Sequence, residues 1–180
     1  MVGAAADAVV PDSEIRIVEA SSPQELADAV GLFRGYAAEL GWDLSGGGRF
    51  AEEIANPPGP YALPTGALLV AYIRDEPVGV LGVQAVPVEP RVPGTGAESA
   101  AELKRLFVRG DCRRLGVGEA LMCHAETVAR RLGYESVVLT TSPHMMPLAQ
   151  GLYERLGYRT TTPYRDDIHV PDIRWLKVDL

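Results

Sequence analysis

Apolar residues in the first part of the chain follow two spacings, one typical of a strand and one typical of a helix. At residues 15–18 apolar and polar positions alternate, which predicts a short strand. Apolar residues then recur at helical spacing as far as Gly41. Ser22, Pro23 and Glu25 precede this run and are typical of a helix start with a capping box. We therefore expect a strand followed by a long capped helix.

The middle of the chain contains a short amphipathic segment and two β-rich runs. Residues 49–55 form the amphipathic segment, and a glycine triplet at 46–48 precedes it. Residues 67–73 and 78–86 are rich in β-forming side chains, and the four residues between them are typical of a turn. These two runs predict an antiparallel hairpin. Residues 87–98 contain three prolines and two glycines, which predicts an exposed loop and not a domain linker.

The second half of the chain alternates between strand and helix patterns. The predicted elements are a strand at 103–108, a helix at 116–132, a strand at 136–140, a helix at about 146–156, and strands near 158–162 and 173–178. The first three of these form a β-loop-α-β unit. No internal repeat is visible.

Length and charge narrow the class of protein. With 180 residues and 47% apolar residues, the chain can bury one core, so one domain is expected. A net charge of −7 argues against nucleic acid or an anionic membrane as a partner, because either would need a basic face. No apolar run approaches the roughly 20 residues that cross a bilayer. A small-molecule partner fits this composition better.

The N-terminal segment and the cysteines indicate a cytoplasmic protein. Residues 1–12 are expected to form a flexible tail, and they lack the basic start of a signal peptide. Cys112 and Cys123 stand eleven residues apart, without CxxC spacing or a nearby pair of histidines. They predict two reduced thiols, and no metal site is expected.

A basic cluster stands where the predicted central strand leads into a helix. Five of the eleven residues from 104 to 114 are Lys or Arg, in a chain whose total charge is negative. The unpaired amides and the positive end of the following helix point to the same place, so an anion is expected there. Gly116 and Gly118 would allow a phosphate to approach the backbone closely.

Two common phosphate loops are excluded at this position. A dinucleotide fingerprint would need a third glycine where Leu121 stands, and a Walker A loop would need a Gly-Lys-Ser/Thr sequence that does not follow. A glycine-rich loop after a strand is also common as a plain tight turn. If the loop at residues 113–118 binds a phosphate, it is a phosphate-binding loop of another type.

Two stretches resemble the motifs of one enzyme family. Residues 102–108, followed by Arg113-x-x-Gly116-x-Gly118, are similar to motif A of the GCN5-related N-acetyltransferases (GNAT), with its Gln/Arg-x-x-Gly-x-Gly/Ala signature. Residues 152–158 are similar to motif B of that family. The likeness extends more weakly over residues 14–180.

This resemblance implies a fold and a ligand. It implies a single α/β (α+β) domain at residues 13–180, with a central mixed, mostly antiparallel sheet of about six or seven strands flanked by about four helices. It implies acetyl-CoA as the cosubstrate and an amine of a small molecule or peptide as the acceptor. Family members are often dimers, so a homodimer is possible. The implied coenzyme A contacts are the backbone of Leu106, Phe107 and Val108 for the pantetheine arm, and Arg113, Arg114, Leu115, Gly116, Val117, Gly118 and Glu119 for the pyrophosphate.

The resemblance also implies two catalytic residues. Glu102 aligns with a glutamate that serves some members as the base, and Glu98, His144 and His169 are substitutes. A glutamate at a strand start is also common as a solvated or ion-paired group. Tyr153 aligns with the tyrosine that protonates the coenzyme A thiolate, although an aromatic residue there can simply pack.

The chain departs from the family at one position. Met146 stands where many members have an asparagine, which removes one contact or transfers it to Gln150 or to the backbone. Neither cysteine has the neighbouring base that a nucleophile needs, so direct transfer in a ternary complex is expected. A non-catalytic acyl-CoA-binding or sensor module is the alternative function.

The acceptor side is less specific. The end of the first helix, with Tyr36, Glu39 and Trp42, is expected to line it, together with the segment around Tyr61 and the loop at residues 162–167. Two aspartates in that loop, at 166 and 167, are able to attract an ammonium group or to be solvated.

Overall fold

The structure is a computed structural model that describes residues 15–86, 99–165, 168 and 172–180. The expected tail at 1–12, the expected loop at 87–98 and the two loop aspartates lie outside the described residues.

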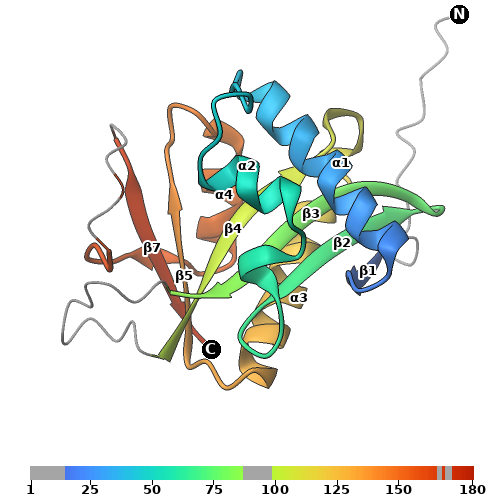
Figure 1. The fold of residues 1–180 in the computed structure, drawn as a ribbon. Helices are drawn as coiled ribbons and strands as arrows, with labels where there is room; N and C mark the ends of the chain where they lie inside the picture. The colour runs from blue at the N-terminus through green and yellow to red at the C-terminus, as the bar shows by residue number, and fades with distance from the viewer. Residues whose placement is uncertain (1–14, 87–98, 166–167, 169–171) are drawn as a thin grey trace, which may run out of the picture.

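In the described part of the chain, seven strands form one sheet that carries helices on both faces (Figure 1). The strands are β1 (Ile15–Glu19), β2 (Ala67–Ile73), β3 (Glu76–Ala85), β4 (Ala100–Val108), β5 (Ser136–Thr141), β6 (Arg159–Thr160) and β7 (Arg174–Asp179). The helices are α1 (Pro23–Glu39), α2 (Arg49–Ala55), α3 (Val117–Arg131) and α4 (Pro147–Arg155). The strand order is β1-β2-β3-β4-β5-β7-β6, and only β4 and β5 run parallel. The predicted fold class is confirmed.

The start of α1 shows how local sequence sets an element. The Ser22 hydroxyl accepts a hydrogen bond from the Glu25 amide at 3.3 Å, and the Glu25 carboxylate accepts one from the Ser22 amide at 2.9 Å. Both halves of the predicted capping box are therefore present. They satisfy amides that the first helical turn leaves without a partner.

Three of the differences from the predicted element boundaries have a structural cause. The hairpin turn consists of Arg74 and Asp75, both with positive φ, so the predicted four-residue turn is wrong and β3 already begins at Glu76. The central strand β4 begins three residues before the predicted start, because Ala100 pairs with Ser136 of β5 and its carbonyl accepts a hydrogen bond from the Val86 amide on the other side. In contrast, β6 is only two residues long, since it lies at the edge and pairs with β7 alone.

The two faces of the sheet are covered by different helices. On one face α3 and the C-terminal part of α4 pack on a core that includes Leu69, Leu81 and Leu121. On the other face α1 and α2 pack on Leu68 and neighbouring side chains. Figure 1 shows α1 and α2 in front of the sheet and α3 behind it.

The strands β4 and β5 separate part-way along their length. Their parallel pairing ends at Leu103 and Leu139, after which β5 continues beside β7 while β4 continues beside β3. Just beyond this point, the pairing of β3 and β4 shifts register and Arg105 adopts a φ of 62°. This is a β-bulge, which turns a strand and redirects its side chains. The backbone of β4 after Leu103 therefore has no β5 neighbour.

Two glycines give a test of how tightly the α1 face is packed. A Cβ at Gly82 would overlap the ring of buried Tyr61, whereas a Cβ at Gly31 in α1 would meet nothing within 4 Å. Gly82→Ala should lower the free energy of unfolding by about 1–3 kcal/mol through overpacking. Gly31→Ala should leave it unchanged or raise it by up to about 1 kcal/mol, because alanine favours the helix. Urea denaturation of both variants measures the difference, and equal stabilities would contradict this packing.

Candidate active site

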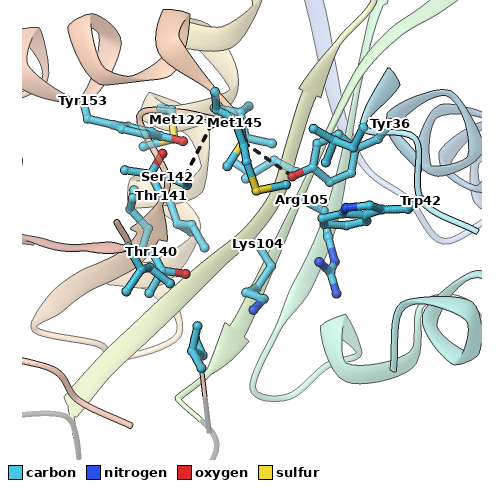
Figure 2. Close-up of a pocket in the computed structure, with 18 of the residues that line it drawn as sticks. Tyr36, Trp42, Lys104, Arg105, Met122, Thr140, Thr141, Ser142, Met145 and Tyr153 are labelled. Atoms are coloured by element: carbon cyan, nitrogen blue, oxygen red, sulfur yellow. Dashed lines mark hydrogen bonds between the residues drawn. The ribbon is translucent and has the colours of Figure 1, made fainter. Parts of the chain in front are cut away.

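A pocket of about 350 Å³ opens where β4 and β5 separate. Its walls come from β4, from the end of β5, from the C-terminal end of α1 and from the segment that leads into α4. Figure 2 shows Tyr153 on one side of this pocket and Tyr36 with Trp42 on the other. The pocket therefore joins residues that are far apart in the sequence.

Tyr153 presents its phenol to this pocket. The residue lies on α4, is 5% exposed and has its ring centroid 6.0 Å from that of Tyr158. Its hydroxyl faces the pocket and makes no hydrogen bond to another described residue. Burial raises the pKa of Tyr153, with a smaller contribution from Tyr36. The phenol is therefore protonated at neutral pH and free to donate to a ligand.

Glu102 lies on β4, completely buried beneath the pocket and not on its wall. One carboxylate oxygen accepts hydrogen bonds from Gln84 at 2.7 Å and from Arg165 at 2.9 Å. The other accepts from Tyr164 at 3.0 Å and from the same Arg165 nitrogen at 3.1 Å. These four contacts occupy the acceptor capacity of the carboxylate. Glu102, which is expected as a base or as a solvated or ion-paired group, thus forms a buried ion pair with Arg165.

The three residues expected to bind the pantetheine arm follow the bulge. Leu106 lines the pocket, Phe107 packs beneath α1 near Gly35, and the Val108 carbonyl accepts a hydrogen bond from the Arg113 side chain at 3.0 Å. Phe107 and Val108 pair with β3, Leu106 lies in the bulge, and the β5-facing side of all three lies where the two strands have separated. An extended ligand can therefore add to this edge as a further strand would.

The loop after β4 ends in the uncapped start of α3. Gly116 is the N-cap residue, with a φ of 85° that strongly favours glycine, and no side chain caps the helix. The Ala120 amide makes the first helical bond, to the Gly116 carbonyl, so the amides before it have no partner in the helix. Together with the positive end of the helix dipole they suit an anion.

The basic side chains near this loop do not converge, in contrast to the sequence expectation. Three of them are held by carboxylates: Arg105 by Glu53, Arg109 by Asp111 and Glu76, and Arg113 by Glu39. Lys104 lies in the pocket instead. The folded chain thus brings backbone amides to the helix start, while most of the cations serve other contacts.

Met146 connects the two sides of the pocket. Its sulfur accepts a hydrogen bond from the Tyr36 hydroxyl at 3.6 Å, and its amide bonds to the Ser142 carbonyl at 2.8 Å. The position that holds asparagine in many GNAT proteins therefore links α4 to α1.

The remaining candidates lie away from the pocket or outside the described residues. His144 is exposed and does not line the pocket, and Glu98 and His169 are not described. Tyr61 is 1% exposed and donates to Glu53 at 2.8 Å, so its own side chain does not line this pocket, whereas Gly59 and Pro60 of the same segment line a second pocket that shares Arg49 with the first. Glu39 binds Arg113 and is not a pocket residue.

The loop at residues 162–167, which is expected to line the acceptor side, brings the buried side chain of Arg165 to the pocket. The sequence pattern does not indicate that the Lys104 side chain enters the pocket, because this depends on the bulge in β4 and on the place of β4 in the sheet.

Comparison with known proteins gives the family. A sequence model of the Acetyltransferase (GNAT) family matches residues 38–158. The chain belongs to this family. It is 34% identical over 168 residues to an uncharacterised N-acetyltransferase of Schizosaccharomyces pombe. This match covers 93% of this chain and 96% of that protein. It is also 34% identical over 92 residues to human N-acetyltransferase 8, but this match covers 51% of the chain and 38% of the human protein.

Solved structures have the same fold. A GNAT-family acetyltransferase from Staphylococcus aureus superposes with a TM-score of 0.68 at 19% identity, covering 92% of this chain and 98% of that one. An aminoglycoside 6'-acetyltransferase type Ii superposes with a TM-score of 0.66 at 21% identity, over 91% and 96% of the two chains. At such identities the likeness concerns the fold alone.

The family assignment confirms the predicted enzyme class, an N-acetyltransferase. The GNAT family uses acetyl-CoA as cosubstrate, and the uncapped helix start and the open β4 edge fit its phosphates and its pantetheine arm. Among the residues that the structure places, no group of three His, Cys, Asp or Glu side chains is arranged to hold a metal ion. Within those same residues, none of the helices has the length and apolar character to cross a membrane.

We expect alanine substitutions at the two loop glycines, Gly116 and Gly118, to have different effects on the affinity for coenzyme A. Gly116→Ala forces a side chain into a left-handed conformation, which displaces the loop amides. The affinity for coenzyme A should fall about tenfold or more, the cost of one hydrogen bond to a charged group. Gly118→Ala is the control, since its Cβ would lie 3.4 Å from Leu152 and the family signature admits alanine there. Calorimetric titration that found equal affinities for both variants would contradict this role of Gly116.

Proposed function

We propose that the protein transfers an acetyl group from acetyl-CoA to a primary amine of a small molecule or peptide, directly within a ternary complex. One observation carries this proposal: the open edge of β4 and the phenol of Tyr153 line the same pocket, which has a volume of about 350 Å³. That volume suits a small ligand. The thioester and the amine can thus meet in one place.

The binding of acetyl-CoA uses mainly backbone groups. The free edge of β4 at Leu106, Phe107 and Val108 takes the pantetheine arm, and residues 113–119 take the pyrophosphate on their amides. Both contacts are made by elements that the sheet and α3 hold rigidly. They direct the thioester toward the pocket between β4 and Tyr153.

The transfer forms one bond and breaks one bond. The nitrogen of the neutral amine bonds to the thioester carbon, and the carbon–sulfur bond breaks with its electron pair going to sulfur. The amine loses one proton to solvent, and the sulfur leaves as a thiolate that receives a hydrogen bond or a proton from Tyr153.

Tyr153 contributes chiefly as a hydrogen-bond donor. A coenzyme A thiol has a pKa near the ~8.5 of cysteine, and burial raises the pKa of the Tyr153 phenol above its ordinary value. Complete proton transfer to the thiolate is therefore uphill, and a strong hydrogen bond in the buried site stabilises the negative sulfur.

Glu102 is a positioning residue in this mechanism. Its oxygens are occupied by Gln84, Tyr164 and Arg165, and it is separated from the pocket space by the side chains on the wall. A proton from the amine would have to displace one of these contacts. Glu102 instead holds Arg165 at the pocket, and solvent accepts the amine proton.

The thiols of the chain take no part in the transfer. Neither Cys112 nor Cys123 lines the pocket, and desolvation raises the pKa of both thiols. These observations support direct transfer over an acyl-cysteine intermediate. A cytoplasmic location and a homodimer remain predictions.

Tyr153→Phe separates catalysis from binding. Removing the hydroxyl should lower kcat by about 10²-fold or more, because the thiolate loses its donor. The KM for acetyl-CoA should change little, since the ring still packs. Tyr158→Phe is the matched control, because the Tyr158 hydroxyl donates to Glu126 and the residue does not line the pocket. The rates are measured as free thiol released from acetyl-CoA with a panel of amines.

Tight binding of acetyl-CoA without turnover of any amine would favour the alternative function, a non-catalytic acyl-CoA-binding or sensor module.

Glu102→Gln tests the positioning role. The kcat/KM for the amine should fall about tenfold or more as Arg165 loses its charged partner, but the acidic limb of its pH profile should remain, because that limb belongs to the amine. A flattened acidic limb would show that Glu102 is the base after all. Thermal unfolding of the variant must accompany the assay, since a buried arginine is left without its carboxylate.

A further inference from the structure

Lys104 is a nearly buried ammonium with few contacts. Its side chain is 15% exposed and lines the pocket. The nearest carboxylate oxygen belongs to Glu102 at 3.9 Å, which is an ion pair but too long for a hydrogen bond. No hydrogen bond joins the Lys104 ammonium to another residue that the structure describes. The ammonium can therefore take a hydrogen-bond acceptor from water or from a ligand in the pocket.

Glu102 cannot supply that acceptor. Its oxygens already receive Gln84, Tyr164 and Arg165. The neighbouring buried carboxylate, Glu53, is likewise occupied by Tyr61 and by both ends of the Arg105 guanidinium. The two buried acids are thus committed to two arginines, and Lys104 is left with its ammonium facing the pocket.

The described pocket wall is basic. It contains Arg49, Lys104, Arg105 and Arg165 and no acidic side chain. Figure 2 shows that the charged ends of Lys104 and Arg105 point the same way from β4, which follows from the bulge between them and β3. Because buried Glu53 and Glu102 offset the charges of Arg105 and Arg165, Lys104 is the cation through which this wall favours an anionic group over a polyamine.

We infer that the acceptor is an amine with a carboxylate of its own, as in an amino acid, and that the Lys104 ammonium binds this carboxylate. The inference rests on the proposed acetyl transfer and names the class of amine that the same pocket takes. Tyr36 and Trp42 on the opposite side offer an aromatic surface to the rest of the molecule. An amino acid with an apolar side chain fits both walls.

The electrostatics of the pocket agree with this assignment. Burial lowers the pKa of Lys104, and Glu102 only partly opposes the effect. A bound carboxylate would favour the charged lysine. The Lys104 ammonium also disfavours a positive charge on an acceptor nitrogen close to it, so it favours the free amine that attacks the thioester.

The test compares acceptors that differ only in the anionic group. Phenylalanine, phenylalanine methyl ester and phenethylamine share one aromatic body, and the phosphonate analogue of phenylalanine replaces the carboxylate by another anion. With acetyl-CoA, thiol release should give phenylalanine a kcat/KM about 10- to 100-fold above the ester and phenethylamine, the worth of a charged hydrogen bond. Preference for the phosphonate over phenylalanine would overturn the carboxylate assignment.

The chain contains only two lysines, which provides a matched control. Lys104→Met should reduce the preference for phenylalanine over phenethylamine to within about threefold, mainly through KM. Lys177→Met should keep it, since Lys177 lies on β7 beside Asp179 and away from the pocket. Binding of phenylalanine to the coenzyme A complex, followed by calorimetry, should weaken in Lys104→Met and not in Lys177→Met. Both variants need unchanged acetyl-CoA affinity for this comparison.

The outcomes distinguish this inference from the proposed function. Turnover of phenethylamine or the ester at least as fast as phenylalanine, or an unchanged preference in Lys104→Met, overturns the inference and leaves acetyl transfer in place. Acetyl-CoA binding without turnover of any acceptor overturns both. Turnover of phenylalanine that depends on Lys104 supports both.

Discussion

The separation of β4 from β5 is the constraint on which the rest of the site depends. A parallel pair within an otherwise antiparallel sheet needs a crossover, and α3 provides it. The crossover places the start of α3 beyond the end of β4, beside the free strand edge. Because the pairing stops at Leu103 and Leu139, one side of β4 is available to a ligand. The uncapped helix start, the free strand edge and the pocket therefore lie together at this one irregularity in the sheet.

Two buried ion pairs hold the pocket side of this opening. Glu53 from α2 binds Arg105, which also lies 4.1 Å over the ring of Phe50, and Glu102 from β4 binds Arg165. Removing one member of such a pair costs about 3–5 kcal/mol, because the other charge is left buried. The side chains of Arg105 and Arg165 are thus held in place at the wall of the pocket. Lys104 differs from them in having its ammonium available to a ligand.

The chemical groups of the site are few and held by different elements. α4 supplies the Tyr153 phenol, α1 supplies the aromatic side, and the Tyr36–Met146 hydrogen bond connects α1 to the start of α4. This contact stands where many family members place asparagine. It provides a physical reason why the substitution is compatible with the site, since the methionine sulfur links the two walls of the pocket.

The sequence by itself determined the order of elements, the capped start of α1, the glycine loop before α3 and the family. These features depend on local rules: apolar spacing, capping residues and the backbone freedom of Gly116. Only the tertiary structure decided that Glu102 is enclosed by Gln84, Tyr164 and Arg165, and that Lys104 faces the pocket. Both depend on the position of β4 in the middle of the sheet and on its bulge, which bring together residues that are distant in the chain and leave no mark in the local pattern.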